Sequence, residues 1–324
     1  MVNDMQTRRQ FNGLLAAGAA SLAHPRTVIA AAANKQTLTY KKVGELEIQA
    51  DVYNSAPGKR QPTVIWIHCG ALIVGHRSGV IQRFHEQLLT EDWTVVSIDY
   101  RLAPETKMPD ILDDVRDACR WVHEEGSERF GTDPDRIAVA GGSAGGFLTL
   151  CTGFLAEQKP KALVSFWGYG DVAGPWLSRP DPFYSSQPEV TAEEARRAVG
   201  IRPLTGTEGA TGRSRFYLYC RQKGLWPREV TSHDPDRERA AFDAFCPLRN
   251  VSKDYPPTLL IHGDKDTDVP YEQSVLMDRE LARQGIEHRL ITVAGGGHGL
   301  SGTEPTVVQQ TYQQAADFLR QQFA

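Results

Sequence analysis

The feature that most constrains the chain is the run of residues 137–147, IAVAGGSAGGF, in which apolar residues of the β type end at a Gly-x-Ser-x-Gly turn. The apolar residues after the turn are suited to open a helix, and strand, tight turn, helix is the order that a nucleophile elbow needs. Gly141 and Gly145 remove the side chains that would clash in such a turn. Ser143 is therefore the candidate nucleophile. Because glycine and serine are also ordinary turn residues, this interpretation requires a base, an acid and an oxyanion site elsewhere in the chain.

The composition is that of a globular protein. The 324 residues, of which 40% are hydrophobic and 23% charged, are enough chain to bury a large core. One large α/β domain, or one such domain with a sizeable insertion, is expected. The formal net charge of −4 provides no basic field, so no nucleic-acid partner is expected.

Residues 1–33 resemble a twin-arginine export signal. Arg8 and Arg9 precede a mildly apolar run of small residues at 14–23, and an alanine-rich stretch at 30–33 is suited to cleavage. The mature protein would then be periplasmic or secreted; the alternative is an amphipathic or disordered leader of a cytoplasmic protein. The run is too short and too rich in glycine and alanine for a comfortable membrane span, so no stable membrane insertion is expected after signal removal.

The cysteines are scattered, without a Cys-x-x-Cys pair, so neither a metal site nor a disulfide framework is predicted. Because their number is odd, at least one thiol stays free, and the pairing of Cys220 with Cys246 is left open. The five cysteines are Cys69, Cys119, Cys151, Cys220 and Cys246.

The order of apolar patterns predicts an α/β fold with a mostly parallel central sheet flanked by helices. Two alternating segments around Gly44 predict an antiparallel hairpin at a sheet edge. Buried strands are predicted at 63–68, 94–98, 137–142, 162–167, 257–262 and 287–293. Helices are predicted at 80–90, 111–125, from the elbow to 157, at 271–284 and at 305–323.

The alternation of strands and helices stops at about residues 169–250, a stretch rich in Pro, Gly, Arg and aromatic residues. A structureless connection of this length is improbable in a compact domain, so we expect a helical cap over the carboxyl ends of the strands. Short helical patterns occur at 191–199, 212–222 and 235–245. Its aromatic residues either line an acyl or sugar pocket or form the core of the cap. They are Trp167, Tyr169, Trp176, Phe216, Tyr217 and Trp226.

Two loops after later strands provide the acid and the base that a serine nucleophile needs. Residues 262–270, HGDKDTDVP, here called the acid loop, offer Asp266, and residues 297–299, GHG, offer His298. The order Ser, Asp, His along the chain is that of α/β-hydrolases. We therefore predict the triad Ser143, Asp266 and His298. Asp268 is the alternative acid; otherwise Asp264 and Asp268 are expected to be solvated or to cap a helix.

An oxyanion site needs backbone N–H donors. One is expected from Ala144, the residue after the serine, and another from residues 68–71, HCGA, here called the oxyanion loop.

Together these motifs resemble the esterase/lipase branch of the α/β-hydrolases, particularly the hormone-sensitive-lipase-like and BD-FAE-like carbohydrate-esterase groups. The resemblance covers residues 62–300 and includes DYRLAPE at 99–105. It implies Asp266 as the acid and the amides of Gly70, Ala71 and Ala144 as oxyanion donors. Cys69 and Ala71 stand where the family has glycine, so the exact donor pair is left open. Because only backbone donors are needed, small side chains need not abolish the oxyanion hole if φ stays negative there. Asp99 and Arg101 are expected to form an ion-paired brace near the floor of the site.

The sequence thus predicts a serine esterase that hydrolyses carboxylic esters through an acyl-enzyme, without a metal or an organic cofactor. The expected substrate is a small-molecule or saccharide ester, and acyl groups on carbohydrates rest on family analogy alone. One alternative is a serine peptidase of the prolyl-oligopeptidase type, which places a large propeller before the catalytic domain, whereas only about thirty residues separate the expected signal from the oxyanion strand. The other is a non-catalytic binding module on the same fold. The oligomeric state is left open.

Overall fold

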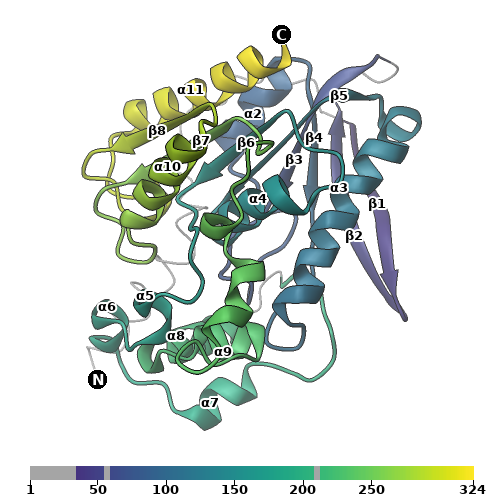
Figure 1. Cartoon of the computed structure of the whole chain (residues 1–324). Coiled ribbons are helices and arrows are strands. Elements are labelled where there is room, and N and C mark those ends of the chain that lie inside the picture. The colour runs from purple at the N-terminus through teal and green to yellow at the C-terminus, as the bar shows by residue number, and fades with distance from the viewer. Residues whose placement is uncertain (1–33, 55–58, 208–211) are drawn as a thin grey trace.

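The computed structural model of the chain describes residues 34–54, 59–207 and 212–324 (Figure 1). The expected export signal, residues 1–33, lies outside the described residues. Among the helices of the described ranges, none has the length and apolarity to cross a membrane.

The described residues form one central sheet of eight strands in the order β1-β2-β4-β3-β5-β6-β7-β8. β1 and β2 form the predicted hairpin, β2 is antiparallel to β4, and all further pairs are parallel. The predicted α/β fold with a mostly parallel sheet is therefore confirmed. The strands are β1 (Asn34–Val43), β2 (Leu46–Asn54), β3 (Gln61–Ile67), β4 (Thr94–Ile98), β5 (Thr132–Gly142), β6 (Ala162–Phe166), β7 (Thr258–Gly263) and β8 (His288–Val293).

Helices cover both faces of the sheet (Figure 1). Along β3, Ile65 and Ile67 belong to one apolar cluster and Val64 and Trp66 to the other, because successive side chains of a strand point to opposite faces. The first cluster includes residues of α3 (Met108–Phe130), α4 (Ala144–Leu155) and α10 (Glu272–Gln284). The second includes residues of α2 (Gln82–Thr90) and α11 (Pro305–Phe323), which pack on each other.

The predicted helices are found at these places, with one clear difference in length. α3 spans Met108–Phe130, whereas the sequence predicted residues 111–125. Pro109 fits its first turn, where no intrahelical N–H is needed, and Gly131 ends it in the left-handed conformation at φ 75°.

The register of the parallel strands brings the functional loops to one edge. Ile67 at the end of β3 is paired with Gly141 near the end of β5, and Gly142 with Phe166 at the end of β6. Further along, Gly263 of β7 is paired with Val293 of β8. The oxyanion loop, the elbow, the acid loop and the loop of His298 therefore follow neighbouring strand ends.

The chain between β6 and β7 is helical and gathers at one end of the sheet, in the lower part of Figure 1. The three predicted helical patterns correspond to α7, α8 and the 3₁₀-helix η1. We refer to this segment as the cap. Its elements are α5 (Pro175–Ser178), α6 (Pro182–Ser185), α7 (Ala192–Arg197), α8 (Arg213–Lys223), α9 (Trp226–Thr231), η1 (Arg239–Phe245) and η2 (Pro247–Arg249).

The aromatic residues of the cap are mainly packing residues. Tyr169 stacks on Phe147 of α4, with ring centroids 4.9 Å apart, and contacts Trp176 and Trp226 edge to face. Trp226 is buried, as are the other predicted aromatic residues except Trp176, which is partly buried. The structure thus favours the second of the two interpretations, a cap core.

Both cysteines of the pairing left open by the sequence are free, as are the other three. Cys220 is buried on α8, whereas the Cys246 thiol contacts Asp171 Oδ1 at 3.7 Å. The Cys220–Cys246 disulfide is therefore not formed in this structure.

Candidate active site

Ser143 lies between β5 and α4 in a backbone conformation that non-glycine residues rarely adopt, at φ 54° and ψ −120°. The neighbouring glycines permit this turn. A Cβ at Gly141 would lie 2.4 Å from the carbonyl oxygen of Gly145, and one at Gly145 would lie 2.0 Å from that of Ile67. The close approach of β3, β5 and α4 that these contacts record is the geometry of the predicted elbow.

The predicted acid and base are in contact. His298 Nδ1 lies 2.7 Å from Asp266 Oδ2, and Asp266 Oδ1 accepts hydrogen bonds from the amides of Asp268 and Val269 at 2.8 and 2.9 Å. Burial would raise the pKa of Asp266, but His298 and His262 outweigh it and lower that pKa. The carboxylate therefore stays ionised and holds the proton of His298 on Nδ1, which leaves Nε2 as the basic nitrogen.

Ser143 is brought near this pair by β6. Its amide donates to the carbonyl of Phe166 at 2.9 Å, and the next residue, Trp167, faces the ring of His298 with centroids 6.3 Å apart. Within the described residues, no hydrogen bond joins Ser143 to His298. Such bonds are commonly long before substrate binds. The structure thus joins acid to base, and it connects Ser143, which is 6% exposed, to this pair through Phe166 and Trp167.

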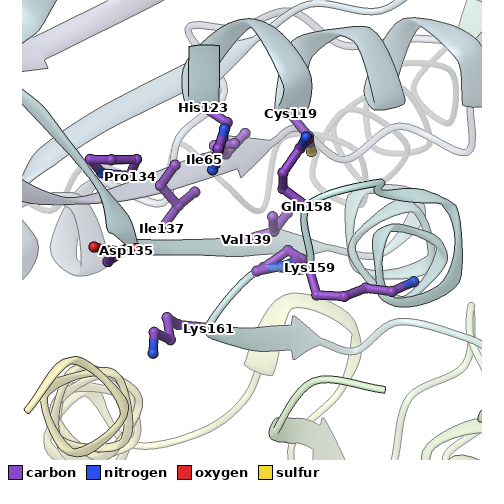
Figure 2. Close-up of a pocket in the computed structure, with 11 residues that line it drawn as sticks. Ile65, Cys119, His123, Pro134, Asp135, Ile137, Val139, Gln158, Lys159 and Lys161 are labelled. Atoms are coloured by element: carbon purple, nitrogen blue, oxygen red, sulfur yellow. The ribbon is translucent and has the colours of Figure 1, made fainter. Parts of the chain in front are cut away.

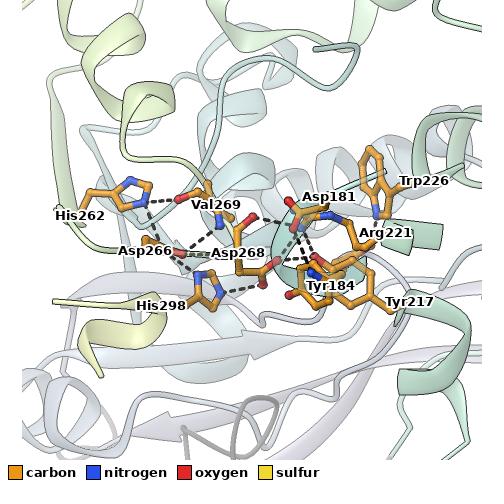
Figure 3. Close-up of polar contacts among 11 residues, drawn as sticks. Asp181, Tyr184, Tyr217, Arg221, Trp226, His262, Asp266, Asp268, Val269 and His298 are labelled. Carbon is orange, nitrogen blue, oxygen red and sulfur yellow. Dashed lines mark hydrogen bonds and ion pairs between the residues drawn. The ribbon is translucent and has the colours of Figure 1, made fainter. Parts of the chain in front are cut away.

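Asp268 contacts the other side of the imidazole. Its Oδ2 lies 3.5 Å from His298 Nε2, and its Oδ1 accepts hydrogen bonds from Tyr217 and from Arg221 Nη1 at 2.5 and 2.7 Å (Figure 3). The expectation that Asp268 is solvated or caps a helix is wrong, because α8 of the cap covers it with a buried arginine. Asp264 caps no helix among the described residues: it accepts a hydrogen bond from the amide of Gly295, in the turn after β8, at 2.7 Å.

The oxyanion loop has positive φ at Gly70 (121°) and Ala71 (55°), and at the next residue, Leu72 (63°). The condition of a negative φ is therefore not met at Ala71. Among the described contacts, the amides of Gly70, Ala71 and Ala144 have no acceptor in the protein, so all three remain available to a ligand oxygen. The cap holds this loop, since Trp226 Nε1 donates to the carbonyl of Ala71 at 2.9 Å.

Cys69 and His68 of the oxyanion loop are structural. Burial raises the pKa of the Cys69 thiol to about 12, so it is neutral and a poor nucleophile. A Cβ at Gly142 would lie 3.0 Å from its sulfur, which shows how closely the thiol packs against the elbow. His68 is buried and stacks on Tyr100, with centroids 4.2 Å apart, and burial lowers its pKa.

The predicted brace is present. Asp99 Oδ2 lies 2.5 Å from Arg77 Nη1, and Arg101 Nε lies 2.7 Å from Asp114 Oδ2 on α3. Tyr100, between them, donates a hydrogen bond from its hydroxyl to the carbonyl of His68 at 3.1 Å. The ion pairs fix the segment of Tyr100, and the hydrogen bond of Tyr100 in turn fixes the oxyanion loop at the floor of the site.

Sequence reasoning missed the roles of Arg221 and His262. His262, the last residue but one of β7, has Nε2 3.3 Å from Asp266 Oδ2 and Nδ1 2.7 Å from the hydroxyl of Ser274, so it holds the acid from the side of the sheet. The position of His262 at the start of the acid loop could have indicated this role. Arg221 contacts Asp268 from 47 positions away, and the only local signal is a charge within the apolar pattern of α8.

A separate hollow of about 160 Å³ lies between α3, β5 and the turn before β6 (Figure 2). Its lining residues Asp135 and Lys161 mark the amino ends of the strands, opposite to the end that carries Ser143. Its volume is below the 300 Å³ or so at which pockets for drug-sized ligands begin. It is not part of the candidate site. Among the described residues, no cluster of three or more His, Cys, Asp or Glu is arranged to hold a metal ion.

Family models match most of this chain. The model described as BD-FAE matches residues 50–281, and one described as TAP-like protein matches residues 243–321. The first range includes Ser143 and Asp266, and the second includes Asp266 and His298.

The chain is similar to curated proteins of quite different lengths. It is 29% identical over 269 residues to esterase LipC of Mycobacterium tuberculosis, which covers 82% of this chain and 59% of that protein. It is 26% identical over 300 residues to the non-reducing polyketide synthase atr1 of Stereocaulon alpinum, which covers 81% of this chain and 12% of the synthase. The chain thus spans less than two thirds of the esterase and about an eighth of the synthase.

A solved structure shares the fold. The hyperthermophilic esterase from Pyrobaculum calidifontis is similar with a TM-score of 0.65 and 23% identity, over 98% of this chain and 90% of that one. With the strand order and the elbow, this likeness identifies the fold as that of the α/β-hydrolases.

Proposed function

The chain belongs to the BD-FAE family, and from this premise we propose that it is a serine esterase that hydrolyses carboxylic esters through an acyl-enzyme on Ser143. The observation that carries the proposal is the contact of Asp266 with His298 Nδ1 at 2.7 Å, beside a strained serine at the elbow. A buried carboxylate on one nitrogen of an imidazole prepares the other nitrogen to act as a base.

In the first step Ser143 Oγ attacks the carbonyl carbon of the ester while His298 Nε2 takes the hydroxyl proton. The carbonyl oxygen of the substrate becomes an oxyanion, and the tetrahedral intermediate collapses as the bond to the alcohol oxygen breaks. His298 gives its proton to that oxygen, so the alcohol leaves and the acyl group stays on Ser143. A water molecule then repeats the sequence, giving the carboxylic acid and the free serine.

The developing oxyanion is accepted by the amides of Gly70, Ala71 and Ala144. Their lack of an acceptor among the described contacts supports this role. Each such donor commonly contributes about 3 kcal/mol to lowering the barrier. The positive φ of Gly70, Ala71 and Leu72 takes the oxyanion loop out of the extended conformation of β3, which supports a role for its backbone amides as ligands.

We further propose a small or saccharide ester as substrate and a periplasmic or secreted location. Acyl groups on carbohydrates are supported by family analogy only. Export rests on Arg8 and Arg9 and the small-residue run that follows them. Replacing both arginines by lysine should keep the protein in the cytoplasm, whereas unchanged export would contradict a twin-arginine signal.

The test of the mechanism compares wild type with Ser143→Ala on p-nitrophenyl butyrate. The variant should lose at least about 10³-fold in kcat. Ser186→Ala, on the exposed surface of the cap, is the matched control and should retain full activity. A fluorophosphonate should label wild type and Ser186→Ala and leave Ser143→Ala unlabelled.

Four outcomes would overturn the proposal. Equal rates for wild type and Ser143→Ala would exclude Ser143 as nucleophile, and a label retained on the variant would locate another one. Peptide p-nitroanilides cleaved in preference to esters would identify the peptidase alternative. Absence of both turnover and labelling in the wild type would favour the binding module.

A further inference from the structure

Asp268 connects the proposed base to the cap. One carboxylate oxygen, Oδ1, is occupied by the hydroxyl of Tyr217 and by Arg221, while the other, Oδ2, faces His298 Nε2 at 3.5 Å (Figure 3). The side chain of Asp268 is only 14% exposed. The nitrogen that must accept the proton of Ser143 therefore faces a carboxylate with little water around it.

Arg221 is held tightly inside the cap. Its side chain is 0% exposed, and Nη2 donates to Asp181 Oδ2 while Nη1 donates to Asp268 Oδ1, both at 2.7 Å. The rings of Tyr184 and Tyr217 lie 4.6 and 5.7 Å from the guanidinium carbon. A buried guanidinium is tolerated only with such partners, so α8 fixes the position of Asp268.

The charges of this cluster do not cancel. One guanidinium, that of Arg221, is shared by two carboxylates, those of Asp181 and Asp268. Asp268 therefore keeps part of its negative charge, and that charge is directed at His298. An imidazole that gains a proton beside it is stabilised, because opposite charges attract strongly where water is excluded.

We propose that Asp268 is a positioning residue for the base, whose carboxylate stabilises the protonated His298 that forms when Ser143 attacks, and that Arg221 of the cap limits this effect by sharing that carboxylate. The inference rests on the proposed esterase function and deepens it. Asp266 and Asp268 then act from opposite sides of one imidazole, the first by a hydrogen bond and the second by its charge.

The groups around His298 determine in which direction each substitution should shift its pKa. Burial lowers its pKa, but Asp268 and Asp266 outweigh burial and raise it, and Arg221 opposes them. The phenol of Tyr217, which donates to Asp268, and the thiol of Cys69 in the oxyanion loop are both neutral because burial raises their pKa. Removing the charge of Asp268 should therefore lower the pKa of His298, and removing that of Arg221 should raise it.

The experiment measures the acid limb of kcat/KM for p-nitrophenyl butyrate, which reports the pKa of the base in the free enzyme. Asp268→Asn should move this limb to lower pH by about one unit and lower the plateau kcat about tenfold. Asp264→Asn is the matched control on the same loop and should leave the limb in place. Arg221→Met should move the limb to higher pH.

A second variant tests the same interaction in case Arg221→Met does not fold. Tyr217→Phe removes one donor to Asp268 and should also move the limb upward, by a smaller amount. An unchanged limb in Asp268→Asn, or shifts of the same sign in Asp268→Asn and Arg221→Met, would overturn the inference.

The same titration can be followed without turnover. The ring protons of His298, assigned in NMR spectra with His298→Gln, should titrate at lower pH in Asp268→Asn. If the wild type hydrolyses no ester, the proposed function fails while this readout still decides the role of Asp268. A pKa of His298 that is the same in both proteins would exclude that role.

Discussion

The indole Nε1 of Trp226 donates a hydrogen bond to the carbonyl oxygen of Ala71 at 2.9 Å, between residues 155 positions apart. Ala71 has a positive φ, and its amide is one of the proposed oxyanion donors. A residue of the cap thus fixes the peptide group that follows a donor of the proposed catalytic site. The cap serves the chemistry through this contact as well as by covering the strand ends.

Trp226→Phe should therefore lower kcat by on the order of tenfold with little change in KM, because a small displacement of the oxyanion loop weakens only transition-state contacts. Trp176→Phe is the matched control, since its indole donates to Asp171 at 3.1 Å within the cap. Steady-state values of kcat and KM for the two variants on one ester would test this prediction. Equal effects of the two substitutions would mean that Trp226 acts only through cap stability.

Asp266→Asn should lower kcat by about 10³- to 10⁴-fold, because an amide no longer fixes the proton of His298 on Nδ1. Asp268→Asn should lower kcat far less than this, since Asp268 has no contact with His298 Nδ1. The comparison is made at the pH of maximal kcat for each protein. A larger loss in Asp268→Asn would transfer the role of the acid to Asp268.

The acid limb of the wild-type profile should have its midpoint above pH 6.5, the ordinary pKa of histidine. Burial lowers the pKa of His298, and Asp268 and Asp266 more than compensate, so the net shift is upward. Because His298 must be neutral to act as a base, kcat/KM rises with pH through this pKa and is lost below it. A midpoint below 6.5 would contradict the balance of these contributions.

The sequence allowed prediction of the sheet, the elbow and the Asp266–His298 contact because each depends on local patterns. Periodicity marks the strands, and glycine marks the turn where a Cβ at Gly145 has no room. The predicted residues meet because parallel strands end at one edge of the sheet.

The contacts of the cap escaped prediction for a physical reason. Arg221 reaches Asp268, and Trp226 reaches Ala71, through the packing of short helices whose relative placement no periodicity determines. The positive φ of Ala71 was missed for the same reason. An alanine in the sequence does not indicate a left-handed conformation. In the structure, Ala71 adopts that conformation in a loop that the cap holds through Trp226.

Gly145→Ala should destabilise the fold by about 3 kcal/mol, because the new Cβ would lie 2.0 Å from the carbonyl oxygen of Ile67 and one backbone must move. Gly285→Ala is the control: its φ of 73° strains a side chain, unlike the helical Gly145, but nothing lies within 4 Å of its Cβ. That substitution should cost only about 1 kcal/mol of backbone strain. Urea unfolding monitored by tryptophan fluorescence gives both values, and equal costs would show that β3 and α4 are less tightly packed than described.

Asp114→Ala should be among the most destabilising substitutions on α3. The carboxylate is 0% exposed and lies 2.7 Å from Arg101 Nε and 2.8 Å from Lys41 Nζ, so its removal leaves two cations without their shared partner. Breaking a buried pair in this way costs about 3–5 kcal/mol.

The neighbouring residue provides the control for this prediction. Asp113 pairs with Arg116 at 2.8 Å, but the two side chains are 45% and 37% exposed. Asp113→Ala should therefore change the free energy of unfolding by no more than about 0.5 kcal/mol. Because Arg101 follows Tyr100, which is hydrogen-bonded to the oxyanion loop, Asp114→Ala should also lower kcat, whereas Asp113→Ala should not. Similar urea midpoints for the two variants would show that the brace contributes nothing beyond a surface ion pair.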